Sequence, residues 1–178
     1  MSKTDENLKA AFAGESQANR KYLAFAKKAE EDGKLQVAKL FRATAAAETV
    51  HAHNHLRVMG GVKSTKENLF EAIAGESYEF KKMYPEFLEK AQEEKNTQAT
   101  ITFGGANKVE EIHHSLYEKA LSAVEKGEDL PSGQICVCQI CGNTVEGTPP
   151  EKCPICGAPR EKFVEIDGAP SADKSVIC

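Results

Sequence analysis

The sequence predicts a mainly α-helical fold, a four-helix bundle followed by a small metal-stabilised domain of β-strands and knuckles. Three observations lead to this expectation. Four long stretches carry apolar residues at steps of three and four, the spacing of a helix with one buried face. A Glu-x-x-His motif occurs twice, each time after a single upstream glutamate. Two Cys-x-x-Cys pairs lie close together near the C-terminal end.

The composition of the 178-residue chain argues against several classes of protein. Its net charge of -4 gives no reason to expect nucleic acid as a partner. No run of about 18 apolar residues occurs, so we expect no membrane partner and no spanning helix. The stretch MSKTDENLKAAFAGE carries acidic residues early and lacks the apolar core of a secretion signal. We therefore expect a cytoplasmic protein.

The expected helices cover residues 4–31, 35–59, 65–94 and 97–126. Thr4 or Asp5 is suited to cap the first of them, and Gly33 is suited to end it. Pro85 lies inside the third helix and is expected to kink it or make its second half irregular. The helix ends and the apolar stripes together define four elements of similar length.

The repeated motif places a carboxylate and an imidazole three residues apart, on one face of a helix. Each motif follows a lone glutamate, at distances of 33 and 34 residues in the two halves. A lone glutamate on an apolar stripe often lies at the edge of the buried face, but the repetition favours a ligand. Two helices with one Glu each and two with Glu-x-x-His form the ligand pattern of a two-metal site in a bundle. The six residues are Glu15, Glu48, His51, Glu76, Glu110 and His113.

Charge balance supports a pair of metal ions at these residues. Burying four carboxylates together is prohibitive without cations, although protonation relieves part of the cost. Four negative charges balance two divalent ions, and Glu79, three residues after Glu76, supplies one more anion for the oxidised state. Carboxylate and imidazole ligands suit iron or manganese, whereas zinc would bind without redox activity.

The C-terminal part contains the most specific single motif of the chain. Cys138 and Cys141 form one Cys-x-x-Cys-Gly knuckle, and Cys153 and Cys156 form the second. Four thiolates at this spacing point to one tetrahedral ion, and about 35 residues need such an ion to stay folded. The spacing alone leaves two readings open, a structural zinc ribbon and a one-electron iron site.

The expected domains are residues 1–130 for the bundle, 131–168 for the four-cysteine domain and 169–178 for a flexible tail. All six cysteines lie at or after position 136, and in a chain without a signal this favours metal thiolates over disulfides. Cys136 and Cys178 have no obvious partner.

The order of these motifs resembles rubrerythrin over nearly the whole chain. The resemblance implies a ferritin-like bundle with a carboxylate-bridged di-iron site and a rubredoxin-like domain with one iron held by four cysteines. It further implies a non-haem di-iron peroxidase that reduces hydrogen peroxide to water in defence against oxidants. Electrons would come from an NAD(P)H-dependent reductase, often through a separate rubredoxin, and reach the di-iron site through the four-cysteine iron.

The resemblance also implies roles for single residues. In this family one iron exchanges a glutamate for a histidine on reduction, and Glu79 and His51 match these groups by position. Tyr22 and Tyr84 match the tyrosines that lie near the metal site, although either could simply be a core aromatic residue. The chain departs from the family at Asn143, where an aromatic residue usually follows the first knuckle glycine.

The short connection between the second and third helices raises the question of a domain swap. A helix over 35–59 is about 37 Å long, whereas residues 60–64 span only about 17 Å when extended. This connection cannot return the chain to the far end of a bundle. We therefore expect a homodimer in which the first two helices of one chain meet the last two of its partner. A monomeric up-down-up-down bundle is the competing arrangement.

Two other functions are compatible with parts of the pattern. A ferritin-type protein would oxidise and store iron, and a metal-binding bundle could carry a structural zinc ribbon. The cysteine motif speaks against storage, because storage needs no electron input.

Overall fold

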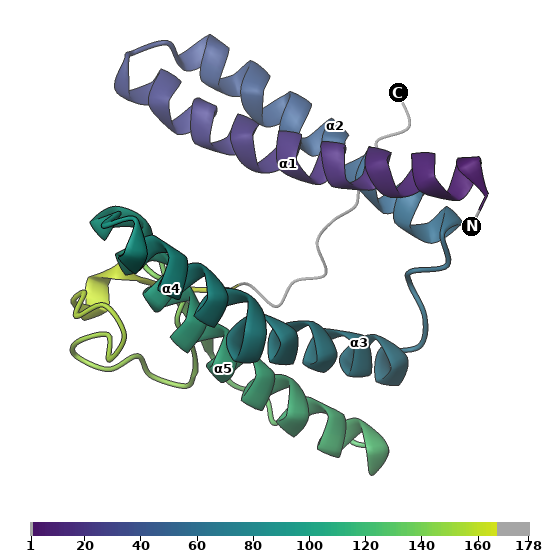
Figure 1. Cartoon of the computed structure of the whole chain (residues 1–178), viewed down its shortest axis with the longest axis vertical. Helices are drawn as coiled ribbons and strands as arrows, with labels where there is room; N and C mark the ends of the chain where they lie inside the picture. Colours follow the sequence, from purple (N-terminus) through teal and green to yellow (C-terminus); the bar gives the residue numbers. More distant parts are fainter. Residues whose placement is uncertain (1, 167–178) are drawn as a thin grey trace. The chain divides into compact units, whose positions relative to one another are not determined.

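The computed structural model describes residues 2–166, which form four long helical segments and a small sheet (Figure 1). The helices are α1 (Lys3–Glu31), α2 (Leu35–Val58), α3 (Thr65–Tyr78), α4 (Tyr84–Glu93) and α5 (Thr97–Glu125). A π-helical segment, η1 (Glu79–Met83), joins α3 to α4, so the third expected helix is one continuous but irregular element. The prediction of a mainly α-helical chain with a small C-terminal sheet is confirmed.

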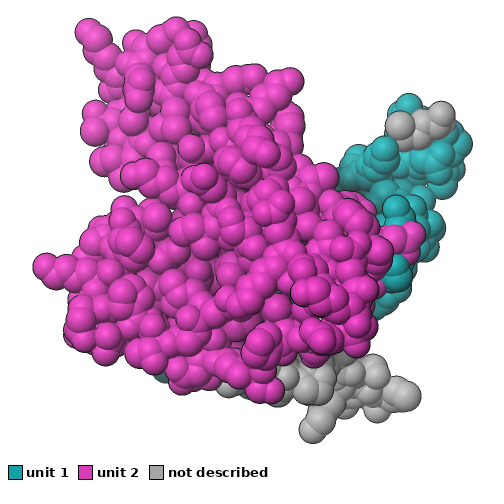
Figure 2. All heavy atoms as spheres, turned by 90° about the horizontal axis from the view of Figure 1, so that it is seen from below, with its two compact units in different colours: residues 1–64 teal, residues 65–178 magenta. Residues whose placement is uncertain are grey.

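The chain divides into two compact units, residues 1–64 and residues 65–178 (Figure 2). The first unit is the hairpin of α1 and α2. The second contains α3, α4, α5 and the four-cysteine domain. The boundary predicted at residue 130 therefore lies inside the second unit and stays a prediction based on the motifs.

Small residues line the contact between α1 and α2. The buried alanines of this hairpin are Ala26, Ala29, Ala38, Ala45 and Ala52. Such residues let two helices approach closely, and one polar residue fixes their register. Asn19, only 9% exposed, donates from Nδ2 to the carbonyl of Ala45 at 2.7 Å and to Thr49 Oγ1 at 2.8 Å.

The larger apolar side chains of the hairpin lie elsewhere. Phe25 is 47% exposed and Leu40 is 62% exposed, although both belong to the stripes expected to face inward. The two helices thus pack through their alanines and leave the broad apolar stripe available for another partner.

Pro85 makes its helix irregular, as expected. Proline has no N–H to donate to the carbonyl four residues back. The turn before it is the five-residue η1, in which the N–H of Tyr84 bonds the carbonyl of Glu79. Single π-turns of this kind often occur at functional sites, and here the segment begins at Glu79.

The expected cap of the first helix is wrong by two or three positions. Ser2 is the N-cap: its Oγ accepts from the N–H of Asp5 at 3.2 Å, and the Asp5 carboxylate accepts from the N–H of Ser2 at 2.8 Å. This reciprocal pair is a capping box. Gly33 follows the helix with φ of 70°, as predicted for a residue that ends it.

The C-terminal sheet has the order β2-β1-β3 and is antiparallel throughout. Its strands are β1 (Ile135–Cys138), β2 (Thr144–Glu146) and β3 (Phe163–Glu165), with a 3-10 turn, η2 (Arg160–Lys162), before the last. The tail predicted at 169–178, with Cys178, lies outside the described residues. Among the described helices, none is long and apolar enough to cross a membrane.

Candidate metal centres

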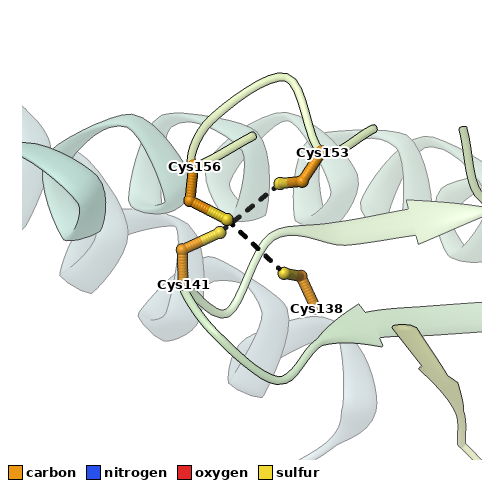
Figure 3. Close-up of side chains that lie close together, drawn as sticks. All are labelled: Cys138, Cys141, Cys153 and Cys156. Atoms are coloured by element: carbon orange, nitrogen blue, oxygen red, sulfur yellow. Dashed lines mark hydrogen bonds between the residues drawn. The ribbon is translucent and has the colours of Figure 1, made fainter. Parts of the chain in front are cut away.

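Four cysteine sulfurs converge between the two knuckles (Figure 3). The Sγ atoms of Cys138 and Cys156 are 3.8 Å apart, and those of Cys141 and Cys153 are 3.6 Å apart. Bonds of about 2.3 Å to a tetrahedral ion place two sulfurs about 3.8 Å apart, whereas a disulfide needs about 2.05 Å. The geometry therefore fits a tetrahedral metal ion.

Backbone hydrogen bonds shape the two knuckles and affect the pKa values of their thiols. Gly142 and Gly157 have φ of 84° and 74°, and their N–H groups donate to the carbonyls of Cys138 and Cys153 at 2.8 Å. Burial opposes ionisation of Cys153, but N–H groups of Cys156 and Ile155 outweigh it and lower its pKa to about 7. Burial raises the pKa of Cys141, so this thiol needs a metal ion to become a thiolate.

Asn143 occupies a special place in this domain. It is 1% exposed, and its Nδ2 donates a hydrogen bond to Cys153 Sγ at 3.7 Å. Its Oδ1 is buried and has no hydrogen-bond partner among the described atoms. A polar side chain thus fills the position of the usual aromatic residue and makes a direct contact with a sulfur of the site.

The first unit contains one carboxylate–histidine cluster, made by Glu15 of α1 and by Glu48 and His51 of α2. Their ligand atoms lie within 4.8 Å of one another. His51 Nδ1 is 2.9 Å from Glu48 Oε2, and the His51 side chain is 55% exposed. The cluster has the donor types for a metal ion, but it supplies only three ligand residues.

The second unit contains the corresponding cluster, made by Glu76 of α3 and by Glu110 and His113 of α5. His113 Nδ1 is 2.7 Å from Glu110 Oε2 and 4.0 Å from Glu76 Oε1. Burial, and then the charge of Glu110, raise the pKa of Glu76 to about 7. The carboxylates of this cluster thus repel one another, and a cation would balance their charge.

Glu79 and Tyr84 lie near the second cluster without belonging to it. Glu79 is not among the three residues whose ligand atoms gather within 4.8 Å. Burial, and then the charge of Glu110, raise its pKa. The pKa of Tyr84 is raised first by burial and then by Glu110, Glu79 and Glu76, so its hydroxyl keeps its proton at neutral pH.

Tyr22 has different surroundings in the first unit. Its ring lies 6.3 Å from that of Phe25 and 6.2 Å from that of Phe41, between centroids. These ring contacts place it in an aromatic group with Phe25 and Phe41.

One residue that reaches the second cluster is not predicted from the sequence. Thr144 Oγ1 lies 3.0 Å from His113 Nε2 and belongs to β2, on the four-cysteine domain. A threonine after a knuckle carries no signal of such a contact in the sequence.

Comparison with known proteins places these motifs in a family. A family model described as rubrerythrin matches residues 6–121, and one described as the rubredoxin-like domain of rubrerythrin matches residues 137–164. Nigerythrin of Nitratidesulfovibrio vulgaris is 40% identical over 174 residues, covering 90% of this chain and 85% of the relative. Rubrerythrin-2 of Clostridium acetobutylicum is 34% identical over 174 residues, covering 90% and 95%.

A solved structure supports the same relationship. The structure of fully reduced, all-ferrous nigerythrin matches with a TM-score of 0.55 and 38% identity. The match covers 93% of this chain and 88% of that chain.

The raised pKa of Glu76 predicts a pH effect on the metal-free protein. Between the ordinary glutamate pKa of 4.5 and the raised pKa of about 7, the folded state keeps a proton that the unfolded state has lost. Stability should therefore fall as pH rises through this interval. Urea unfolding at about pH 5 and about pH 7.5 measures the effect, and Glu76→Gln should reduce the difference. Glu71→Gln, an exposed change on the same helix, should leave the difference in stability between the two pH values unchanged. An equal pH dependence in both variants would contradict the assignment of the effect to Glu76.

The contact between Asn143 and Cys153 predicts an effect on reduction potential. A donated N–H stabilises negative charge on sulfur, which is larger in the ferrous state. In the protein loaded with iron, Asn143→Leu should lower the potential of the four-cysteine site by tens of millivolts, where about 59 mV is a tenfold change. A redox titration followed by visible absorption measures this. Gln139→Leu, an exposed change in the same knuckle, should leave the potential unchanged, and an unaltered potential in Asn143→Leu would refute the role.

Proposed function

The chain belongs to the rubrerythrin family, and on that premise we propose that it is a peroxidase that reduces hydrogen peroxide to water. Its cofactors are a carboxylate-bridged di-iron site and one iron held by four cysteines. When bound, the iron pair supplies two electrons to the peroxide, which takes up two protons and yields two water molecules. The observation that carries the proposal is that a Glu/His cluster and a four-sulfur cluster occur in one unit, where His113 of the first cluster is hydrogen-bonded to Thr144 of the four-cysteine domain.

We assign the di-iron ligands to the two clusters together with one further carboxylate. The residues are Glu15, Glu48, His51, Glu76, Glu79, Glu110 and His113. Each cluster alone offers two carboxylates and one imidazole, and the two together complete the pattern of a bridged metal pair. The four-cysteine iron is assigned to Cys138, Cys141, Cys153 and Cys156.

Glu79 and His51 are the residues we propose to exchange at one iron. Glu79 stands at the first residue of η1, close enough to Glu110 for that charge to raise its pKa. An anionic carboxylate favours the ferric state, and a neutral imidazole suffices for the ferrous state.

Tyr84 is proposed to deliver a hydrogen bond to the bound oxidant. Its raised pKa keeps the hydroxyl protonated, and the carboxylates that raise it are Glu110, Glu79 and Glu76. The phenol can therefore donate where oxygen charge develops. A role for Tyr22 rests on its match to the family tyrosine alone.

The electron donors are proposed to be an NAD(P)H-dependent reductase and a rubredoxin. A four-sulfur iron without an open position exchanges single electrons, which suits a partner that delivers them one at a time. Thiols kept free for metal need a reducing compartment, so we propose the cytosol.

The α2–α3 connection supports a domain-swapped homodimer. α2 has 24 residues and is about 36 Å long, whereas the link at residues 59–64 spans at most about 21 Å. Exposed apolar residues on both units, among them Phe25, Leu40 and Phe70, need a cover. We propose that the first unit of one chain and the second unit of its partner cover each other, which would join the two Glu/His clusters.

The role of Glu79 predicts a slower reaction with peroxide. The reduced Glu79→Ala variant, mixed with hydrogen peroxide without oxygen, should be reoxidised at least about tenfold more slowly than the unmodified protein. Stopped-flow absorption measures the rate, and metal analysis checks that iron is retained. Glu89→Ala removes an exposed charge from the same helical segment and should react normally. Equal rates in Glu79→Ala would remove this role, and an unmodified protein that peroxide does not oxidise would end the peroxidase proposal.

The proposed swap predicts complementation between two inactive variants. Glu48→Ala and Glu110→Ala should each destroy every di-iron site in a homodimer. A mixed swapped dimer contains one chain of each variant. One of its two sites then carries both substitutions and the other carries neither, so about half of the peroxide reactivity should return. Two affinity tags allow purification of the mixed dimer. An unswapped arrangement leaves the mixed dimer as inactive as its parents, as does a monomer.

A further inference from the structure

The four-cysteine domain contacts α5 beside the second carboxylate cluster. Two side chains of β2 make the contact: Thr144 Oγ1 lies 3.0 Å from His113 Nε2, and Glu146 Oε2 accepts from Lys119 Nζ at 2.6 Å. The backbone of Gly142 also lies close to α5, since a Cβ at this position would be 3.8 Å from Val109 Cγ1. The first strand residue after a knuckle thus reaches a histidine of the Glu/His cluster.

The direction of the hydrogen bonds follows from the groups involved. Thr144 Oγ1 lies 3.1 Å from the carbonyl oxygen of Gly142, which can only accept. The threonine hydroxyl therefore gives its single proton to Gly142 and accepts from His113. Nε2 of His113 then carries a hydrogen, so in the neutral ring the lone pair is on Nδ1, where it can bind a cation. Without a cation, the 2.7 Å contact of Nδ1 with Glu110 Oε2 requires a hydrogen between these atoms, on the ring or on the carboxyl group. Nδ1 is the nitrogen that lies beside Glu110 and Glu76.

We propose that Thr144 is a positioning residue that holds His113 in the tautomer whose Nδ1 faces the metal. This inference rests on the proposed role of His113 as a ligand. The four-cysteine domain would then have a second role besides binding its own ion. Its residue Thr144, three positions after Cys141, would orient His113 of the Glu/His cluster in the same chain. The hydrogen-bonded path runs from Gly142, next to Cys141, through Thr144 to His113.

The two histidines of the repeated motif are unequal in this respect. Both place Nδ1 within 2.9 Å of the glutamate of their own motif. Within the described residues of the first unit, His51 has no hydrogen-bond partner at Nε2, whereas His113 has Thr144. An anchored His113 would remain bound in both redox states, and the unanchored His51 would be the histidine that moves.

The tautomer of His113 tests the proposal without any reaction. Two-bond ¹H–¹⁵N spectra of the full zinc-loaded protein, which is diamagnetic, report which ring nitrogen carries hydrogen and which binds metal. The unmodified protein and Thr144→Ser should show Nε2–H with metal on Nδ1. Thr144→Val keeps the side-chain shape without the hydroxyl and should show exchange broadening or a mixture of forms. An unchanged Nδ1-bound signal of His113 in Thr144→Val would overturn the proposal.

Zinc affinity gives an independent readout. Competition with a chelator should show Glu/His-site binding about 10- to 100-fold weaker in Thr144→Val, the usual effect of losing a partner of a metal ligand. Thr144→Ser should restore it. Thr148→Val, an exposed change in the same domain, should have no effect, and the four-cysteine site should bind normally in all variants.

The outcomes separate this inference from the function proposed above. Unchanged zinc affinity in Thr144→Val, together with weak binding in His113→Ala, would refute the role of Thr144 alone. Normal binding in His113→Ala would refute the ligand assignment on which both proposals rest.

Discussion

The gathering of carboxylates on half-buried helix faces is the electrostatic constraint on which the rest of this structure depends. Glu76 shows the constraint most clearly, because burial and the neighbouring Glu110 raise its pKa to about 7. Cations remove this cost directly, and the interleaved histidines supply neutral ligands without adding charge. The same reasoning applies to the thiols: the buried Cys141 needs an ion to ionise, and the knuckles hold four sulfurs at the spacing that a tetrahedral ion requires.

Each half of the helical part combines exposed large apolar side chains with a cluster of three candidate metal ligands. The α1–α2 hairpin closes through alanines and is held in register by Asn19, so its large apolar side chains stay on the outside. Its Glu/His cluster has three ligand residues, and so has the cluster of the second unit. In both units, the helices that carry an incomplete set of metal ligands also carry exposed apolar side chains. The proposed domain-swapped dimer would therefore complete the metal site and bury the apolar side chains at the same time.

The four-cysteine domain is connected to the Glu/His chemistry by more than sequence order. Its strand β2 contacts α5 at both His113 and Lys119. This contact distinguishes the two Glu-x-x-His motifs, which are equivalent in the sequence, since only His113 is held at Nε2 in the described structure. The domain that is proposed to supply electrons thus also decides the orientation of one histidine.

Features that depend on local spacing could be predicted from the sequence alone. The helix boundaries agree with the structure within one or two residues, because the 3.6-residue period, Gly33 and Pro85 act over a turn or two. The Glu-x-x-His pairs and the Cys-x-x-Cys knuckles are equally local, and the family comparisons confirm the class of cofactor. The ligand assignments, the tyrosine roles and the swap stay predictions.

Contacts between residues far apart in the chain are visible only in the three-dimensional structure. Thr144 reaches His113 across 31 positions, and the Asn143 amide reaches Cys153 across 10. In the first hairpin, alanines make the buried contact and the larger Phe25 and Leu40 stay exposed. Hydrogen bonds and close contacts between separate elements depend on how the backbones pack. Neither residue type nor periodicity predicts the distance between two side chains on different elements.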